Sequence, residues 1–384
     1  MTAASQTSNA PAATPTGDPW LLTPGPLTTS PSVKEAMLHD YGSRDRHFIE
    51  VNRRVRQRLV ALIDGEETHV TVPLQGSGTF VVEAMLATFV PPRGKLLLLI
   101  NGAYGQRMAK ICRYLERQTV IEEWPEDTPV DPARAAAILA ADEAITHVAV
   151  VHCETTSGVL NPIEELGRVV AGHGRRLLID AMSAFGALPV SAREVAFDAL
   201  AASANKCLEG VPGLGFCLAN KEALAASQGN SHSLSLDLHD QWVSMEANGQ
   251  WRFTPPTHAI IAFDRALQEF DEEGGLSGRG ARYRENGRIL IEGMRALGFK
   301  TLLADEVQAP IIVTFHMPAD PHFDFAVFYE ALRERGYVIY PGKLTVAESF
   351  RIGCIGRLGA EQMTGALRAI EETLSAMGVT NCAP

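Results

Sequence analysis

Short apolar segments of strand length recur along the middle of the chain, each followed by a stretch long enough for a helix. They span residues 95–100, 147–153, 176–180 and 214–218. Strands that alternate with helices favour parallel pairing, with helices packed on both faces of one sheet. The sequence therefore predicts an α/β fold built on a mostly parallel, doubly wound sheet.

The pattern changes after Gly274-Gly275, a pair that is typical of a joint between domains. A long helix near residues 281–297 follows, and then strands and a last helix that begins at Ala360. A chain of 384 residues can bury a large core and should form at least two lobes. We predict a disordered leader over residues 1–19, a large domain over 20–275 and a smaller α+β domain over 276–384.

Composition limits the partners and the compartment. The formal net charge of −11 disfavours nucleic acid as a partner, because no basic patch dominates. The six cysteines include no Cys-x-x-Cys pair, which argues against a metal site or a disulfide framework and predicts reduced thiols in the cytoplasm. No apolar run is long enough to cross a membrane.

Lys206 stands among small and apolar residues in the segment SANKCLEGVPG, which begins at Ser203. Burial of an ammonium group is costly and lowers its pKa, as a lysine that forms an imine requires. Asp180 ends the apolar segment 26 residues earlier, where strands of an open sheet line a ligand crevice. A carboxylate at that place can face the pyridine nitrogen of pyridoxal phosphate. The alternatives are a solvated turn lysine and a helix-capping aspartate.

Three further features are candidates for ligand binding. The turn Gly76-Ser77-Gly78-Thr79 precedes an apolar helix, and its free amides could hold a phosphate or simply cap the helix. Tyr104 follows a buried strand and could lie against a bound ring, or it is a half-exposed loop residue. Arg351 lies in an apolar strand, where it either pairs with an internal acid or binds an anionic ligand.

Several motifs in one order resemble the class V aminotransferases of pyridoxal phosphate fold type I. The resemblance covers residues 20–379, nearly everything except the leader. The motifs, in chain order, are TPGP from Thr23, GSGT from Gly76, the Tyr104 loop, ETTSG from Glu154, IDA from Ile179, SANKC from Ser203 and FRIG from Phe350.

The resemblance implies roles for the candidates around the cofactor ring. Lys206 would carry the cofactor as an imine and, once substrate displaces it, move protons at the substrate carbon. Asp180 would keep the pyridine nitrogen protonated. Tyr104 would stack on the ring, where relatives often have tryptophan, and the hydroxyl of Thr155 would lie near the phenolic oxygen of the ring.

The resemblance also implies the anion-binding residues and a homodimer. Arg351 would grip the acid group of the substrate. Thr254 would reach the cofactor phosphate of a partner subunit, so that each active site is shared. The other residues of the phosphate site would be Ser77, Gly78, Thr79 and Asn205.

The implied reaction is transfer of the amino group of 2-aminoethylphosphonate to pyruvate, giving phosphonoacetaldehyde and L-alanine. A single cationic site can bind a carboxylate and a phosphonate in turn. An alanine–glyoxylate or serine–pyruvate aminotransferase would use nearly the same residues and stays open. More remote alternatives are a nucleotide-binding oxidoreductase, in which Lys206 is structural, and a binding protein without catalysis.

Overall fold

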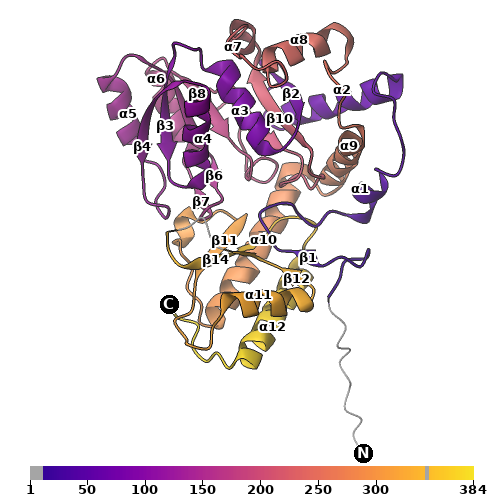
Figure 1. The fold of residues 1–384 in the computed structure, drawn as a ribbon, viewed down its shortest axis with the longest axis vertical. Coiled ribbons are helices and arrows are strands. Elements are labelled where there is room, and N and C mark those ends of the chain that lie inside the picture. Colours follow the sequence, from indigo (N-terminus) through magenta and orange to yellow (C-terminus); the bar gives the residue numbers. More distant parts are fainter. Residues whose placement is uncertain (1–11, 342–345) are drawn as a thin grey trace, which may run out of the picture.

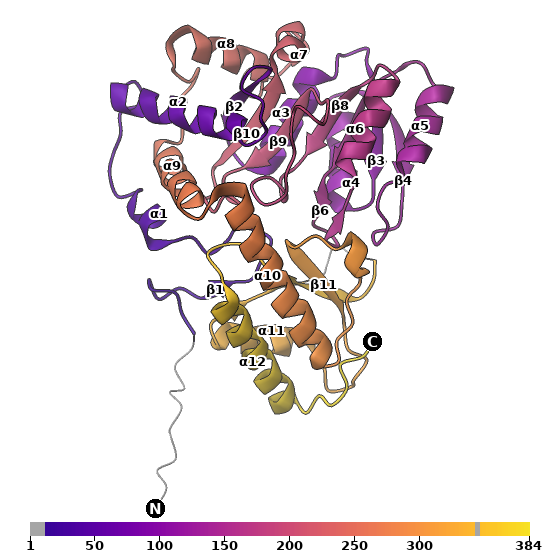
Figure 2. The same ribbon diagram turned by 180° about the vertical axis from the view of Figure 1, so that it is seen from behind.

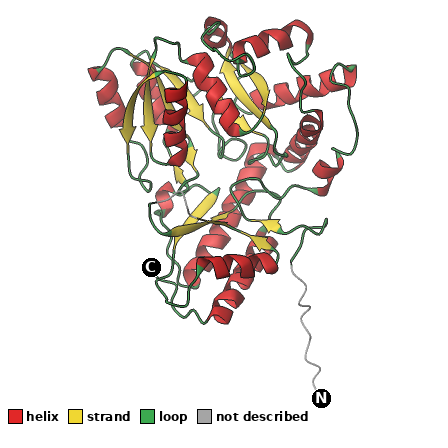
Figure 3. Ribbon diagram, viewed as in Figure 1, coloured by secondary structure: helices red, strands yellow, loops and turns green. Residues whose placement is uncertain are grey.

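The computed structural model describes residues 12–341 and 346–384 of the 384-residue chain. Figure 1 shows a large sheet flanked by helices, below which lies a smaller group of strands and helices from the C-terminal part of the chain. Coloured by secondary structure, the strands form an upper and a lower group with a short hairpin between them (Figure 3).

The large sheet has seven strands within the described residues, and its order is β2-β10-β9-β8-β5-β3-β4. Every neighbouring pair is parallel except the two that β10 makes with β2 and β9. The mostly parallel sheet predicted from the sequence is therefore confirmed. Its strands are β2 (His69–Gln75), β3 (Lys95–Ile100), β4 (Gln118–Glu123), β5 (Ile145–Val151), β8 (Arg176–Asp180), β9 (Ala199–Ser203) and β10 (Leu214–Asn220).

Alternate side chains of the central strands enter two cores, one on each face of this sheet. Leu96 and Leu98 pack in one core and Leu97 and Leu99 in the other, because successive strand residues point to opposite faces. The first face carries α3 (Gly78–Phe89), α4 (Ala103–Tyr114), α7 (Lys221–Ala226) and α8 (Leu238–Asn248). The second carries α1 (Pro31–Glu35), α2 (Arg46–Ala61), α5 (Pro132–Ala141), α6 (Ile163–Gly172) and α9 (Thr257–Glu272).

A third core lies among the C-terminal elements, which Figure 2 shows from behind. An antiparallel sheet in the order β11-β14-β13 packs with three helices, and β1 pairs in parallel with β12. These elements are β1 (Trp20–Leu21), β11 (Ile312–His316), β12 (Tyr337–Val338), β13 (Tyr340–Pro341), β14 (Ser349–Gly353), α10 (Gly275–Ala296), α11 (Phe325–Glu334) and α12 (Ala360–Met377). The short hairpin of β6 (Cys153–Glu154) and β7 (Val159–Leu160) lies between the two sheets, and the 3₁₀ helix η1 (Asp305–Val307) precedes β11.

The N-terminal segment differs from its prediction. Residues 1–11 of the predicted disordered leader lie outside the described residues, but residues 12–18 are folded onto the protein. The Ala12 amide donates to Arg335 O at 3.0 Å, and Asp18 forms an ion pair with Lys34. Leu22 is fully buried in the C-terminal core, not in the core of the large sheet. Polar and small residues can order on a preformed surface, which composition does not reveal.

Several elements were not predicted from the sequence, among them β4, α8 and β9. The stretch 231–250 contains α8, which Asp237 caps and Gly249 ends in a left-handed conformation. The strand β9 has the sequence ALAAS, without the β-branched or aromatic residues that mark strands. We propose that the boundary between the two domains lies at Gly274-Gly275, where both residues have positive φ between α9 and α10.

Within residues 12–341 and 346–384, none of the helices combines the length and the apolar character that a membrane crossing requires.

Candidate active site

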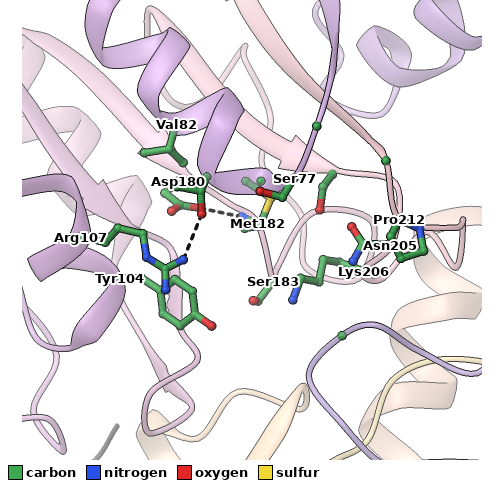
Figure 4. Close-up of a pocket in the computed structure, with 16 residues that line it drawn as sticks. Ser77, Val82, Tyr104, Arg107, Asp180, Met182, Ser183, Asn205, Lys206 and Pro212 are labelled. Atoms are coloured by element: carbon green, nitrogen blue, oxygen red, sulfur yellow. Dashed lines mark hydrogen bonds between the residues drawn. The ribbon is translucent and has the colours of Figure 1, made fainter. Parts of the chain in front are cut away.

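A cavity of about 350 Å³ opens at the carboxyl ends of the parallel strands, where open α/β sheets bind ligands. Its walls come from the segments that follow β2, β3, β8 and β9, and from Gly25 of the N-terminal segment. Figure 4 shows the side chains of Lys206, Asp180, Ser77 and Tyr104 converging on this space. The cavity has the volume of a site for one small molecule.

Lys206 follows β9 and points its amine into the cavity (Figure 4). The Lys206 Nζ donates to Pro24 O at 2.8 Å. Burial lowers the pKa of the Lys206 amine to about 8, and the charges of Arg107 and Arg351 act in the same direction. Gly25 has φ +120°, and a Cβ atom there would lie 2.7 Å from Nζ, so only glycine leaves room for the amine.

Asp180 ends β8 and lines the same cavity. Its side chain is 4% exposed, and Oδ1 accepts a hydrogen bond from the Met182 amide at 3.0 Å. Burial raises the pKa of Asp180 to about 6, although the Met182 amide and the charges of Arg107 and Lys206 oppose the shift. The amine and the carboxylate that the sequence analysis singled out therefore share one cavity.

The amino end of α3 forms another wall of the cavity. Ser77 is the N-cap residue and makes no side-chain capping hydrogen bond, and it lines the cavity together with Gly78 and Thr79. A Cβ atom at Gly78 would overlap the side chain of Met182, which explains glycine there. Asn205 lines the cavity beside these residues. Unpaired amides and hydroxyls at a helix N-terminus form an anion site.

Tyr104 lies in the first turn of α4 and lines the cavity. The guanidinium of Arg107, one turn later, lies 4.7 Å from the centroid of the Tyr104 ring. Arg107 NH1 also donates to Thr79 Oγ1 at 3.1 Å, which links α4 to the amino end of α3. Sequence analysis did not single out Arg107; its spacing of three from Tyr104 on a helix was the available signal.

Arg351 and Thr155 are in contact with each other but are not part of the cavity wall. Arg351 lies in β14, is 1% exposed, and its NH1 donates to Thr155 O at 2.6 Å. Its guanidinium lies 5.2 Å from the centroid of the Tyr340 ring. The Thr155 hydroxyl accepts from Ser183 Oγ at 3.4 Å, and Ser183 lines the cavity.

Thr254 does not reach the cavity of its own chain. It is exposed and lines a separate hollow of about 340 Å³ together with Arg44, Trp251 and Arg252. Its predicted role requires a second subunit, and the structure describes one chain.

The residues of the cavity can be compared with the groups that pyridoxal phosphate would present to them. A primary amine and a carboxylate face one enclosed space, which is the donor set that the aldehyde carbon and the pyridine nitrogen need. The amino end of α3 fits a phosphate. The hydroxyl of Ser203 is buried in this wall without a hydrogen-bond partner among the described residues. The residues therefore fit the cofactor.

The model of the family described as "Aminotransferase class-V" matches residues 34–351, more than half of the chain. The chain belongs to the class-V aminotransferases. Aminotransferases of this class use pyridoxal phosphate, in agreement with the fit of the cavity.

Two curated relatives of this family align over nearly their whole lengths. A 2-aminoethylphosphonate–pyruvate transaminase from Burkholderia lata is 56% identical over 361 residues, which cover 94% of this chain and 96% of the relative. One from Pseudomonas putida is 55% identical, covering 94% and 98%. Both similarities extend well past the motifs around the cavity.

Solved structures of aminotransferases have the same fold. The pyridoxamine–pyruvate aminotransferase from Mesorhizobium loti superposes with a TM-score of 0.85 at 26% identity, covering 95% of this chain and 94% of that one. The alanine–glyoxylate aminotransferase from Nostoc sp. gives a TM-score of 0.86 at 23% identity, covering 93% and 95%. The second similarity shows the fold alone. The predicted fold type is confirmed.

Proposed function

We propose that this class-V aminotransferase transfers the amino group of 2-aminoethylphosphonate to pyruvate, yielding phosphonoacetaldehyde and L-alanine. The observation that carries the proposal is the identity of 55–56% over 94% of the chain to transaminases named for that reaction. The cavity supports it, because its amine and carboxylate suit the cofactor that amino-group transfer requires.

Lys206 is the proposed base of the reaction. With a pKa of about 8, roughly a tenth of its amines are neutral at pH 7, compared with well under a thousandth at an ordinary lysine pKa. A neutral amine can attack an aldehyde carbon and later accept a proton. Gly25 leaves room for Nζ, and the hydrogen bond to Pro24 O keeps it at the cavity, so a proton can pass directly between Nζ and a substrate bound there.

Asp180 is the proposed partner of the pyridine nitrogen. When bound, pyridoxal phosphate supplies an electron sink that stabilises negative charge on the substrate carbon. Asp180 is mostly ionised at pH 7 with a pKa near 6, and a carboxylate in a buried site favours a protonated nitrogen beside it. The Met182 amide orients the carboxylate.

The remaining cofactor-binding roles follow from the cavity wall. We assign the phosphate to Ser77, Gly78, Thr79 and Asn205, at the amino end of α3. The Tyr104 ring is the proposed stacking partner of the cofactor. Thr155, which reaches the cavity through Ser183, is the proposed neighbour of the phenolic oxygen.

Arg351 is the proposed anchor for the acid group of both substrates. The guanidinium donates to Thr155 O and lies against the Tyr340 ring, so its orientation is already restricted and little rotational freedom is lost when substrate binds. Its charge contributes to the lowered pKa of Lys206, which supports its proximity to the amine. Bidentate pairing suits carboxylate and phosphonate oxygens alike.

Thr254 leads us to propose a homodimer in which each subunit completes the other's phosphate site. The residue is exposed and remote from its own cavity, and a side chain used in trans would be placed in this way. A hybrid of Lys206→Ala and Thr254→Ala subunits tests it. One site of the hybrid would be intact, so mixing two impaired variants should restore turnover; no recovery in mixtures shown to exchange subunits would exclude a shared site.

The six cysteines support the cytoplasm as the proposed compartment. All six are free and buried in the structure. Thiols persist in a reducing environment, whereas an oxidising one favours disulfides.

Turnover of defined amine donors is the test of the proposed reaction. Purified protein loaded with pyridoxal phosphate should convert 2-aminoethylphosphonate and pyruvate to L-alanine, with ping-pong kinetics. Alanine with glyoxylate and serine with pyruvate are the controls for the alternative aminotransferase reactions. Turnover of those pairs without turnover of 2-aminoethylphosphonate would overturn the proposed substrate but leave the family assignment intact.

A further inference from the structure

The carboxylate of Glu154 is the hub of a buried hydrogen-bond network between the cavity and the C-terminal sheet. Glu154 lies in β6 and is 0% exposed. Its Oε2 accepts from the backbone amides of Tyr104 and Gly105, each at 3.2 Å. Its Oε1 accepts from the Thr156 amide at 3.1 Å and from the Thr156 hydroxyl at 2.6 Å.

One side of this network fixes the start of α4. The Thr156 hydroxyl accepts from the Ala103 amide at 2.8 Å, so three successive amides of the first turn are tied to β6 and its turn. A Cβ atom at Gly102 would overlap the Glu154 side chain, which shows how closely the two segments pack. A carboxylate at a helix N-terminus is also favoured by the helix dipole. Tyr104, which lines the cavity, is held in place by the hydrogen bond from its backbone amide to Glu154.

The other side of the network leads to Arg351. The turn after Glu154 is closed by a hydrogen bond from the Gly158 amide to Glu154 O at 2.8 Å. Within this turn, Thr155 O accepts from Arg351 NH1 and Ser157 O accepts from Thr314 Oγ1 at 2.8 Å. Arg351 and Thr314 face each other on β14 and β11. The turn that Glu154 organises therefore supplies the acceptor that holds the Arg351 guanidinium.

Only a carboxylate satisfies all four donors. Each of its oxygens accepts two hydrogen bonds, whereas an amide side chain would turn its NH₂ group toward one pair of donors. Because the site is fully buried, water cannot take the place of a lost acceptor, and an unpaired buried group is costly.

We propose that Glu154 is a positioning residue of the active site, whose carboxylate holds Tyr104 toward the cofactor and, through the 155–158 turn, holds Arg351 toward the substrate. The Arg351 part rests on the proposed function. The Tyr104 part concerns cofactor binding and does not depend on which amine is the substrate.

The first experiment measures pyridoxal phosphate affinity by absorbance titration of the cofactor-free protein. Glu154→Gln should weaken binding about tenfold or more, because a buried charged acceptor is lost. The matched control is Asp198→Asn, a largely buried carboxylate that pairs with Arg176 just before β9, at the amino ends of the strands and so at the end of the sheet away from the cavity. The control should stay within about twofold of the parent.

A double-mutant cycle separates positioning from a general structural effect. If Glu154 acts through Tyr104, Glu154→Gln should cost less than about twofold in a Tyr104→Ala background. Unchanged affinity in the single variant, or an equal tenfold cost in both backgrounds, would overturn the proposal. Should Glu154→Gln fail to fold by circular dichroism, Thr156→Val removes the 2.6 Å donor of the same network and is subject to the same outcomes.

The second experiment measures the Michaelis constants at saturating cofactor. Glu154→Gln should raise KM for pyruvate and for 2-aminoethylphosphonate about tenfold, because the turn whose Thr155 O accepts from Arg351 is no longer fixed. An unchanged KM for both would remove Arg351 from the proposal. A parent protein that does not turn over 2-aminoethylphosphonate would contradict the proposed function, while the affinity titration would still decide the role of Glu154.

Discussion

Two groups of buried charges meet at the loop after β9, where Lys206 and Glu209 are three residues apart, and their surroundings affect them in opposite ways. Lys206 and Asp180 face the cavity, and burial moves their pKa values toward neutrality, to about 8 and about 6. Glu209, in the same loop as Lys206, and Glu273 are paired with arginines of α10.

In the second group the partners reverse the effect of burial. Burial alone would raise the pKa of Glu273, but the hydrogen bonds and charges of Arg282 and Arg279 lower it to about 2. The Arg282 NH2 lies 2.6 Å from Glu209 Oε1, and Arg279 NH1 donates to Cys207 O at 2.6 Å. Paired charges therefore anchor the loop, while the charges that face the cavity remain available for proton transfer.

The largest effect is expected at Lys206. Lys206→Arg keeps a positive charge but has no amine that is neutral near pH 7, so turnover should fall at least about a thousandfold. Initial rates of L-alanine formation measure it, and the visible absorption of bound cofactor should change as well. Near-normal turnover would place the reacting amine elsewhere.

Asp180→Asn should have the next largest effect. Loss of a preorganised charge opposite the pyridine nitrogen should lower kcat by about 100-fold, with the fold retained. Pre-steady-state absorbance separates the reaction step from cofactor loss. A kcat within twofold of the parent at saturating cofactor would contradict the role of this carboxylate.

Glu273→Gln tests the paired group in the same way. Glu273 is 18% exposed, so removal of its charge should cost about 2–3 kcal/mol of unfolding free energy, less than for a fully buried pair. Urea unfolding measures the loss, and the folded fraction should keep its kcat. A large fall in kcat without a loss of stability would erase the distinction between the two groups.

Lys206→Met should stabilise the cofactor-free protein by about 3 kcal/mol at pH 7, because a buried charge is removed. The folded pKa of Lys206 lies below its ordinary value of 10.5, so the unfolded state binds more protons between about pH 8 and 10.5. The penalty is full below pH 8 and disappears above 10.5. Urea unfolding at pH 7 and pH 11 measures it, with Lys110→Met, at an exposed lysine of α4, as the control. A destabilised Lys206→Met at pH 7 would contradict a lowered pKa of Lys206 in the folded protein.

Local sequence signals predicted much of the fold. Ser30 caps α1 with Pro31 at its first position, and α12 begins at Ala360 as predicted. Strand β9 was missed because its alanines carry no strand signal, although tertiary pairing with β8 and β10 makes it central. Tertiary context can override propensity in this way.

The candidate site was predicted residue by residue, and the structure brings together seven of its members: Ser77, Gly78, Thr79, Tyr104, Asp180, Asn205 and Lys206. Their roles remain predictions. Arg107 and Glu154 were not assigned roles, because what they do depends on partners distant in sequence. The four hydrogen bonds of Glu154 exist only once β6 packs against the start of α4.

A crystal structure of the protein with pyridoxal phosphate tests the central claim most directly. The claim predicts continuous density between Lys206 Nζ and the cofactor, with a carboxylate oxygen of Asp180 at about 2.7–3.0 Å from the pyridine nitrogen. A cofactor bound elsewhere, or a ring whose nitrogen lies away from Asp180, would contradict it.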